Sequence, residues 1–222
     1  TETAHVEYDV NQIKLAEYLL QIKAIKLDIT NPFTWASGWK SPIYCDNRKT
    51  LSYPVIRSYI RDAFVEVIRE KFPGVEGIAG VATGAIGIGA LVADVLNLPF
   101  VYIRSKPKDH GLTNMIEGEV VPKQKMVVVE DLVSTGKSSL NAVRALRDAG
   151  AEVLGMTAIF TYDFPVARER FTEDDVLLYT LTDYPHLIDI AAATGYILPE
   201  HLASLKEWRN DPENWKIQTD GR

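Results

Sequence analysis

Apolar positions follow a helical period in two segments of the N-terminal third of the chain. In residues 11–24, isoleucines and leucines recur with a roughly helical spacing. The stripe is clearer in residues 54–72, where Pro54 suits a first helical turn and Pro73-Gly74 ends the pattern. We therefore predict one helix in each segment.

The pattern changes after residue 74 to short, mostly apolar runs, each followed by a polar or glycine-bearing turn. These runs occupy residues 78–81, 100–103, 126–129 and 153–160. Runs that are apolar on both faces are typical of buried parallel strands. Helical patterns lie between them at 86–96 and 138–149. This alternation predicts an α/β fold with a mostly parallel central sheet flanked by helices.

The rest of the chain looks like an addition to this core. We predict a single domain over residues 1–222, in which about 1–50 and about 185–222 surround the sheet and its helices. In open α/β sheets, ligands bind outside the carboxyl ends of the strands. The turns after residues 81, 103 and 129 are therefore considered together as candidates for one ligand site.

Composition limits the classes of protein to consider. The 222 residues are 46% hydrophobic, enough for a core, and the net charge of −6 argues against a nucleic-acid-binding surface. No apolar run approaches a membrane span, and the acidic start from Glu2 is unlike a signal peptide. The one cysteine, Cys45, cannot form an internal disulfide, so we expect a protein of the reducing cytoplasm.

The stretch "VVVEDLVSTGKSS" at 127–139 carries the most specific chemistry, although two nucleotide-binding templates fail on the sequence. In the phosphate-loop pattern G-x-x-x-x-G-K-[ST], Asp131 occupies the place of the first glycine. The dinucleotide pattern G-x-G-x-x-G cannot be drawn through Gly84, Gly87 and Gly89. A kinase of the phosphate-loop class and a dinucleotide-binding enzyme are both disfavoured.

The same stretch still has a physical interpretation. Backbone N–H groups and hydroxyls in a turn before a helix, here residues 134–138, bind phosphate well. Glu130 and Asp131 repel phosphate but accept hydrogen bonds from hydroxyls, so the two carboxylates fit the vicinal diol of a ribose. The alternative is an acidic strand end followed by an ordinary serine-capped helix.

A second polar segment follows the strand predicted at 100–103. Residues 104–110 hold three cationic side chains against Asp109 alone, a local charge of +2 in an acidic chain. Residues 104–118 lack apolar periodicity, so we expect a mobile cationic lid over a polyphosphate. The alternative is a solvated basic turn. Similarly, the small residues of "GVATGAIGIG" at 80–89 fit close helix packing as well as a ligand-binding loop.

Residues 126–138 resemble the phosphoribosyl pyrophosphate (PRPP) signature of the type I phosphoribosyltransferases: four apolar residues, two acids, two apolar residues and a hydroxyl/glycine turn. The resemblance implies this family's core with a small N-terminal hood. It implies that Glu130 and Asp131 hold the ribose hydroxyls. It also implies a 5-phosphate site made of Leu132, Val133, Ser134, Thr135, Gly136, Lys137 and Ser138.

Two further stretches resemble the orotate phosphoribosyltransferases within this family. "RSKPKDHG" at 104–111 is similar to their catalytic loop R-K-x-x-K-x-H-G, with Ser105 in place of the first lysine and Lys106 one position later. "FTWASGWKSPIYCDNR" at 33–48 is similar to their N-terminal motif, with Ala36 where many members carry lysine.

The resemblance assigns further residues. The pyrophosphate loop would contain Thr83, Gly84 and Ala85, although some members have lysine at the position of Gly84. Some members also bind orotate through an arginine where this chain has Phe164, so that role is not carried over. The implied catalytic residues are Arg104, Lys108, His110 and Asp131, of which the first three also bind PRPP; the implied orotate-binding residues are Ser134, Tyr44 and Arg48.

The implied enzyme transfers the phosphoribosyl group from PRPP to orotate, giving orotidine 5′-monophosphate and pyrophosphate for UMP biosynthesis. Mg²⁺ would be held mainly by PRPP and water, with no direct protein ligand, and a homodimer would share its active sites. Three alternatives stay open: a related transferase that uses a purine base, a non-catalytic regulator that binds nucleotide or RNA, and the disfavoured phosphate-loop kinase. Turnover with different bases separates them.

Overall fold

The computed structural model describes residues 10–106 and 114–216. The chain forms two compact units, one built from residues 1–45 together with 182–222, and one from residues 46–181. Each is described by itself. Within the described ranges, no helix combines the length and apolar character that crossing a bilayer requires. The single domain with additions at about 1–50 and 185–222 stays a prediction.

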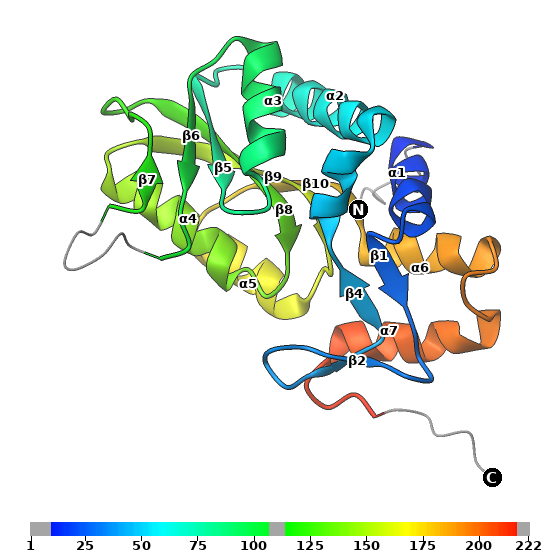
Figure 1. Cartoon of the computed structure of the whole chain (residues 1–222). Coiled ribbons are helices and arrows are strands. Elements are labelled where there is room, and N and C mark those ends of the chain that lie inside the picture. Colours follow the sequence, from blue (N-terminus) through cyan, green and yellow to red (C-terminus); the bar gives the residue numbers. More distant parts are fainter. Residues whose placement is uncertain (1–9, 107–113, 217–222) are drawn as a thin grey trace, which may run out of the picture. The chain divides into compact units, whose positions relative to one another are not determined.

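A six-stranded sheet in the order β10-β9-β8-β5-β6-β7 organises the α/β unit (Figure 1). The strands are β5 (Gly77–Val81), β6 (Phe100–Ile103), β7 (Ile116–Glu117), β8 (Lys125–Val133), β9 (Glu152–Thr161) and β10 (Leu178–Asp183), the last of which continues into the other unit. β5 pairs in parallel with β6 and β8, and β8 with β9, whereas β6 and β7 are antiparallel. The predicted mostly parallel sheet is confirmed.

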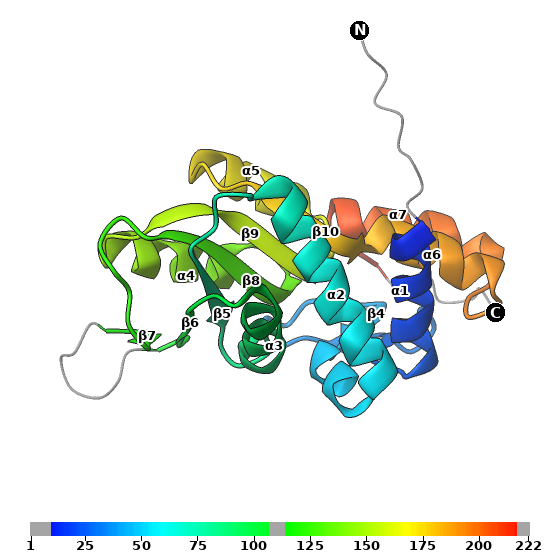
Figure 2. The ribbon, with the colours of Figure 1, turned by 90° about the horizontal axis from the view of Figure 1, so that it is seen from above.

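Helices cover both faces of this sheet. They are the 3₁₀ helix η1 (Asn47–Ser52), α2 (Pro54–Lys71), α3 (Ile86–Leu96), α4 (Lys137–Asp148) and α5 (Pro165–Glu173). α2 packs on α3, and α4 packs on α5. Figure 2 shows the first pair on one side of the sheet and the second pair on the other. Right-handed crossovers require this, because the chain moves across the sheet in opposite directions after β5 and after β8.

The apolar runs form the core because, as the sequence pattern predicted, they are buried. All five residues of β5 are buried, and Val127, Val128 and Val129 of β8 are fully buried. The apolar stripe of α2 is buried as well, and the helix ends at Lys71, just before Pro73. The stretch 104–118, expected to be a mobile lid, is corrected at its end, because residues 116–117 form β7 and pair with Tyr102 and Ile103 of β6.

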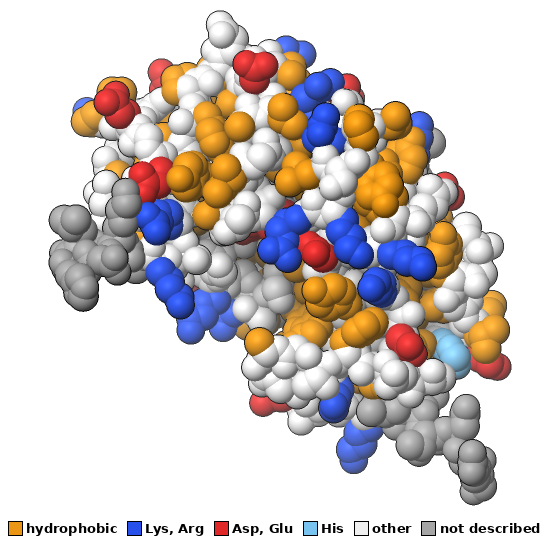
Figure 3. Space-filling model, viewed as in Figure 1, with side chains coloured by type: hydrophobic (Ala, Val, Ile, Leu, Met, Phe, Trp, Pro, Cys, Tyr) orange, Lys and Arg blue, Asp and Glu red, His pale blue; other side chains and the backbone are white. Residues whose placement is uncertain are grey.

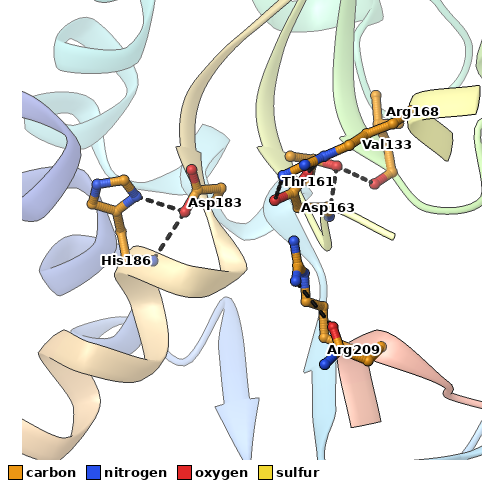
Figure 4. A network of polar contacts seen from close by, with 8 residues as sticks. Val133, Thr161, Asp163, Arg168, Asp183, His186 and Arg209 are labelled. Atoms are coloured by element: carbon orange, nitrogen blue, oxygen red, sulfur yellow. Dashed lines mark hydrogen bonds and ion pairs between the residues drawn. The ribbon is translucent and has the colours of Figure 1, made fainter. Parts of the chain in front are cut away.

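The other unit combines segments from both ends of the chain. Its elements are α1 (Val10–Gln21), β1 (Ile25–Leu27), β2 (Phe33–Thr34), β3 (Lys40–Ser41), β4 (Ile43–Cys45), α6 (Tyr184–Ala193), the 3₁₀ helix η2 (Pro199–His201) and α7 (Leu202–Asn210). Trp208 is fully buried and donates its indole N–H to the Lys40 carbonyl at 3.1 Å. Asp183 caps α6 by accepting hydrogen bonds from the backbone N–H and ring of His186 (Figure 4). The Trp208 bond joins the C-terminal segment to the N-terminal one, and the Asp183 cap fixes the start of α6.

Candidate active site

The predicted set of turns meets at one edge of the sheet. β5 lies between β6 and β8, with Val81 opposite Ile103 and Gly80 opposite Val129 in parallel register. Parallel strands present their carboxyl ends at the same edge, so the segments that follow them are neighbours. A pocket of about 850 Å³ reaches this edge, where it is lined by Val81, Arg104, Ser105, Thr135, Lys137 and Ser138, and extends along the following helix as far as Ala149. Arg104 and the turn predicted to bind phosphate therefore share one pocket.

The turn at residues 134–138 leads into helix α4. Gly136 stands at the N-cap of α4 with φ +86°, a left-handed conformation that favours glycine. This cap residue has no side chain, so it offers no oxygen to the first N–H groups of α4. Those groups, with exposed Lys137 and Ser138, can receive a phosphate at the positive end of the helix. No serine caps α4, because Gly136 occupies the N-cap; the phosphate site itself stays a prediction.

Helix α5 supports this turn from behind, which the sequence did not reveal. Arg170 donates a hydrogen bond from Nη1 to the Thr135 carbonyl at 2.9 Å. A Cβ added to Gly136 would lie 3.2 Å from the ring of Phe171, so the turn packs closely on α5. The start of α5 is secured by the bidentate pair of Arg168 with Asp163, drawn in Figure 4.

The two acids of the signature have different environments. Glu130 is 4% exposed; its Oε1 accepts the Asp131 N–H at 3.0 Å and its Oε2 accepts the Ser139 hydroxyl at 2.9 Å. Desolvation by burial, then the neighbouring Asp131 carboxylate, raises the pKa of Glu130 well above its ordinary value. Asp131 is half-buried. The ribose contact stays a prediction for both residues, and the geometry favours Asp131.

The Asp131 carboxylate lies against the loop after β5. A Cβ added to Gly84 would overlap this carboxylate, with Asp131 Oδ1 at 2.7 Å. Gly80 and Gly89 instead allow close packing, because a Cβ there would meet the Ala85 carbonyl or the Phe100 ring within 3.0 Å. The packing interpretation of 80–89 therefore holds for these two glycines, while Gly84 makes room for a carboxylate. The candidate loop residues Thr83 and Ala85 are exposed and buried, respectively.

The structure describes only part of the predicted lid. Arg104 forms an ion pair with Glu117 of β7, Nη1 to Oε1 at 3.1 Å, so β7 orients this cation at the pocket. Ser105 and Lys106 are exposed. Lys108 and His110, predicted to be catalytic, lie outside the described residues.

The residues predicted to contact orotate come from both units. Ser134 is half-buried at the phosphate turn. Arg48 in η1 pairs with Asp46 at 2.9 Å and lowers the pKa of that carboxyl. Tyr44 belongs to the other unit, where its ring lies 5.8 Å from that of Phe33. These base contacts stay predictions.

Phe164 and Ala36 are two positions at which this chain departs from some members of the family. Phe164 is 1% exposed and packs its ring 5.4 Å from that of Tyr162 in the core. It is therefore a packing residue. Ala36 is exposed in the turn between β2 and β3.

The comparisons with known proteins agree with this geometry. The phosphoribosyl transferase domain family matches residues 52–179. The orotate phosphoribosyltransferase of Bacteroides fragilis is 62% identical over 201 residues, which are 90% of this chain and 95% of that protein. A crystal structure of orotate phosphoribosyltransferase from Aeropyrum pernix has 28% identity and a TM-score of 0.71 over 82% of this chain and 99% of that one. UMP synthase of Leishmania donovani has a TM-score of 0.76 at 25% identity; the match covers 89% of this chain but 42% of that longer one.

Proposed function

Since the chain belongs to the orotate phosphoribosyltransferase family, we propose that it transfers the phosphoribosyl group of PRPP to orotate, giving orotidine 5′-monophosphate and pyrophosphate for UMP biosynthesis. The observation that carries the proposal is the glycine-capped turn at Gly136 beside the strand end that bears Asp131. The anomeric carbon exchanges its bond to a pyrophosphate oxygen for a bond to a ring nitrogen of orotate.

The phosphate turn binds and orients the substrate. The first N–H groups of α4 and the Ser138 hydroxyl bind the 5-phosphate, and Lys137 adds a positive charge. Arg170 keeps the turn in place through the Thr135 carbonyl. A phosphate held there directs the ribose toward the end of β8, where Asp131 stands.

Asp131 has two tasks in this proposal. Its carboxylate accepts hydrogen bonds from the ribose hydroxyls, which fixes the sugar ring. As the bond to pyrophosphate breaks, the sugar gains positive charge, and a nearby carboxylate stabilises that charge electrostatically. Glu130, whose oxygens are bound by Asp131 N–H and Ser139, supports the strand end from the interior.

Mg²⁺ fits the donors at this site as a substrate-borne ion. Among the described residues, no group of three or more His, Cys, Asp or Glu side chains could hold a metal. Mg²⁺ keeps several waters and commonly binds through substrate phosphates, so PRPP and water would supply its ligands, with no direct protein ligand. Bound there, the ion would neutralise charge on the pyrophosphate.

We further propose that the enzyme works in the cytoplasm as a homodimer with shared active sites. Support for the dimer comes from hydrophobic side chains on α2, α3 and the residue before α2: Tyr53, Val55 and Val95 are exposed. Figure 3 shows hydrophobic side chains gathered over α2 and α3.

Arg104, and with it Lys108 and His110, would stabilise the departing pyrophosphate, and closure of the lid would exclude water. The acidic net charge of −6 makes nucleic acid an unsuitable partner.

The test is turnover with a choice of bases. Purified protein, Mg²⁺ and PRPP are mixed with orotate, adenine, hypoxanthine or uracil, and loss of each base is followed by ultraviolet absorbance. We expect loss of orotate alone, dependent on both PRPP and Mg²⁺. Preferred loss of a purine would support the related transferase, and no base loss at all would contradict transferase activity.

A further inference from the structure

We propose that Asn47 is a positioning residue for Asp131: its side-chain amide holds the backbone of the strand end from which the reactive carboxylate projects. The inference rests on the role proposed above for Asp131 and adds a residue from a distant part of the chain. Asn47 itself need not touch either substrate.

The contact is direct and buried. Asn47 Nδ2 donates a hydrogen bond to the Asp131 carbonyl oxygen at 2.8 Å, across 84 positions of sequence. Asn47 is 2% exposed, so water does not compete for this donor. A buried carbonyl that loses its donor is left unsatisfied, which favours a shift of the backbone that carries it.

Asp131 needs such a support because it lies where β8 no longer pairs with β5. The pairing of β5 with β8 runs from Gly77–Met126 to Gly80–Val129 and goes no further, since β5 ends at Val81. On the other side, β9 pairs with β8 as far as Val133. Asp131 therefore stands two residues beyond the last rung with β5. The amide of Asn47 supplies a backbone partner that this strand no longer provides.

The segment that carries Asn47 is itself fixed. Thr50 donates its hydroxyl to the Asn47 carbonyl at 2.6 Å, which closes the first turn of η1. Arg57 of α2 donates to the Leu51 carbonyl at 2.9 Å. Leu51 also lies against α3, where a Cβ on Gly87 would be 3.3 Å from Leu51 Cδ2. A donor on a braced turn can hold a strand end within the narrow tolerance that a catalytic group requires.

The test is Asn47→Leu, which keeps much of the side-chain volume and removes the donor. We expect PRPP affinity and kcat/KM for PRPP to fall by roughly tenfold, the factor that one lost buried hydrogen bond produces. KM for orotate should change little. If Asn47→Leu does not fold, Asn47→Ser takes its place, because its smaller side chain also lacks the amide that reaches the Asp131 carbonyl.

Thr50→Val is the matched control. It also removes a buried hydrogen bond from η1 but leaves the amide on Asp131 in place. Because Thr50 also holds the segment that carries Asn47, we expect a melting temperature lowered by an amount similar to Asn47→Leu and a fall in PRPP affinity clearly smaller than the fall in Asn47→Leu. Equal loss of PRPP affinity in both variants would mean that any loosening of η1 has this effect, and would overturn the positioning role.

A double-mutant cycle with Asp131→Asn separates this inference from the function on which it rests. If Asn47 acts through Asp131, then Asn47→Leu should lower PRPP affinity by less than about twofold in the Asp131→Asn background. Full additivity, with Asp131→Asn itself impaired, would overturn the role of Asn47 alone. Unchanged kinetics in Asp131→Asn would overturn the role of Asp131 and, with it, this inference.

Discussion

Gly84→Ala tests the contact between the loop after β5 and the Asp131 carboxylate. The added Cβ would stand 2.7 Å from Asp131 Oδ1 and closer still to the other carboxylate atoms. Ordinary van der Waals contact begins at about 3.4 Å, so the carboxylate must move by roughly 1 Å or rotate to another rotamer. Either movement removes it from the place where we expect the ribose hydroxyls.

The expected size of the effect follows from the interaction lost. A hydrogen bond to a charged group contributes about 1.5–3 kcal/mol, so kcat/KM for PRPP should fall roughly ten- to a hundredfold. Orotate consumption is measured by ultraviolet absorbance over a range of PRPP concentrations. Gly87→Ala is the matched control, because its Cβ would meet only the flexible side chain of Leu51, at 3.3 Å. We expect Gly87→Ala to remain within about twofold of wild type.

Two results would refute this reasoning. Wild-type kinetics in a folded Gly84→Ala protein would show that the position of the Asp131 carboxylate does not limit PRPP use. Equal damage from Gly84→Ala and Gly87→Ala would show that the loop tolerates no side chain for reasons unrelated to Asp131. A crystal structure of Gly84→Ala would show directly whether the carboxylate has moved.

Three other predictions concern stability, the phosphate turn and assembly. Folding raises the pKa of Glu130, so the folded state holds a proton that the unfolded state releases, and the stability contributed by this carboxyl falls as pH rises above its unfolded pKa of about 4.3. Glu130→Gln should therefore melt a few degrees above wild type at neutral pH, with the gap closing toward pH 4; a constant gap would contradict the shift. Arg170→Gln should raise KM for PRPP several-fold without changing KM for orotate, because the Thr135 carbonyl loses a charged donor; an effect on orotate alone would argue against a supporting role. If the dimer shares its sites, mixing Asp131→Asn with Lys108→Ala proteins should restore about a quarter of wild-type activity, since about half the dimers are mixed and each has one intact site; verified exchange without recovery would reject shared sites.

The sequence was sufficient for the four central strands of the sheet, β9, β8, β5 and β6, because their signals were local, whereas the edge strands β10 and β7 were not predicted. Buried strands such as 126–129 are apolar on both faces and long enough to be recognised, and the turns that follow them carry the chemistry. The strand β7 was missed because two residues give too little periodicity, and only its pairing with β6 defines it. From the sequence, Glu130 and Asp131 were both predicted to bind the ribose hydroxyls. Their different environments are expected from the strand period of two, by which neighbours point to opposite faces.

Other parts of the site depend on tertiary contacts that no local pattern encodes. Asn47 meets Asp131 across 84 positions, and Arg170 meets Thr135 across 35. Neither residue lies in a motif that announces its partner. Ser139 directly follows the signature, but its bond to Glu130 depends on how α4 packs against β8.

The most direct measurement of the central claim is the steady-state kinetics of Asp131→Asn with PRPP and orotate. The account predicts that wild-type protein consumes orotate only when PRPP is present. It predicts that Asp131→Asn keeps its melting temperature within a few degrees while kcat/KM for PRPP falls roughly ten- to a hundredfold, the loss of one charge-assisted contact. Unchanged kinetics in the folded variant would contradict the account, because Asp131 would then only end a strand.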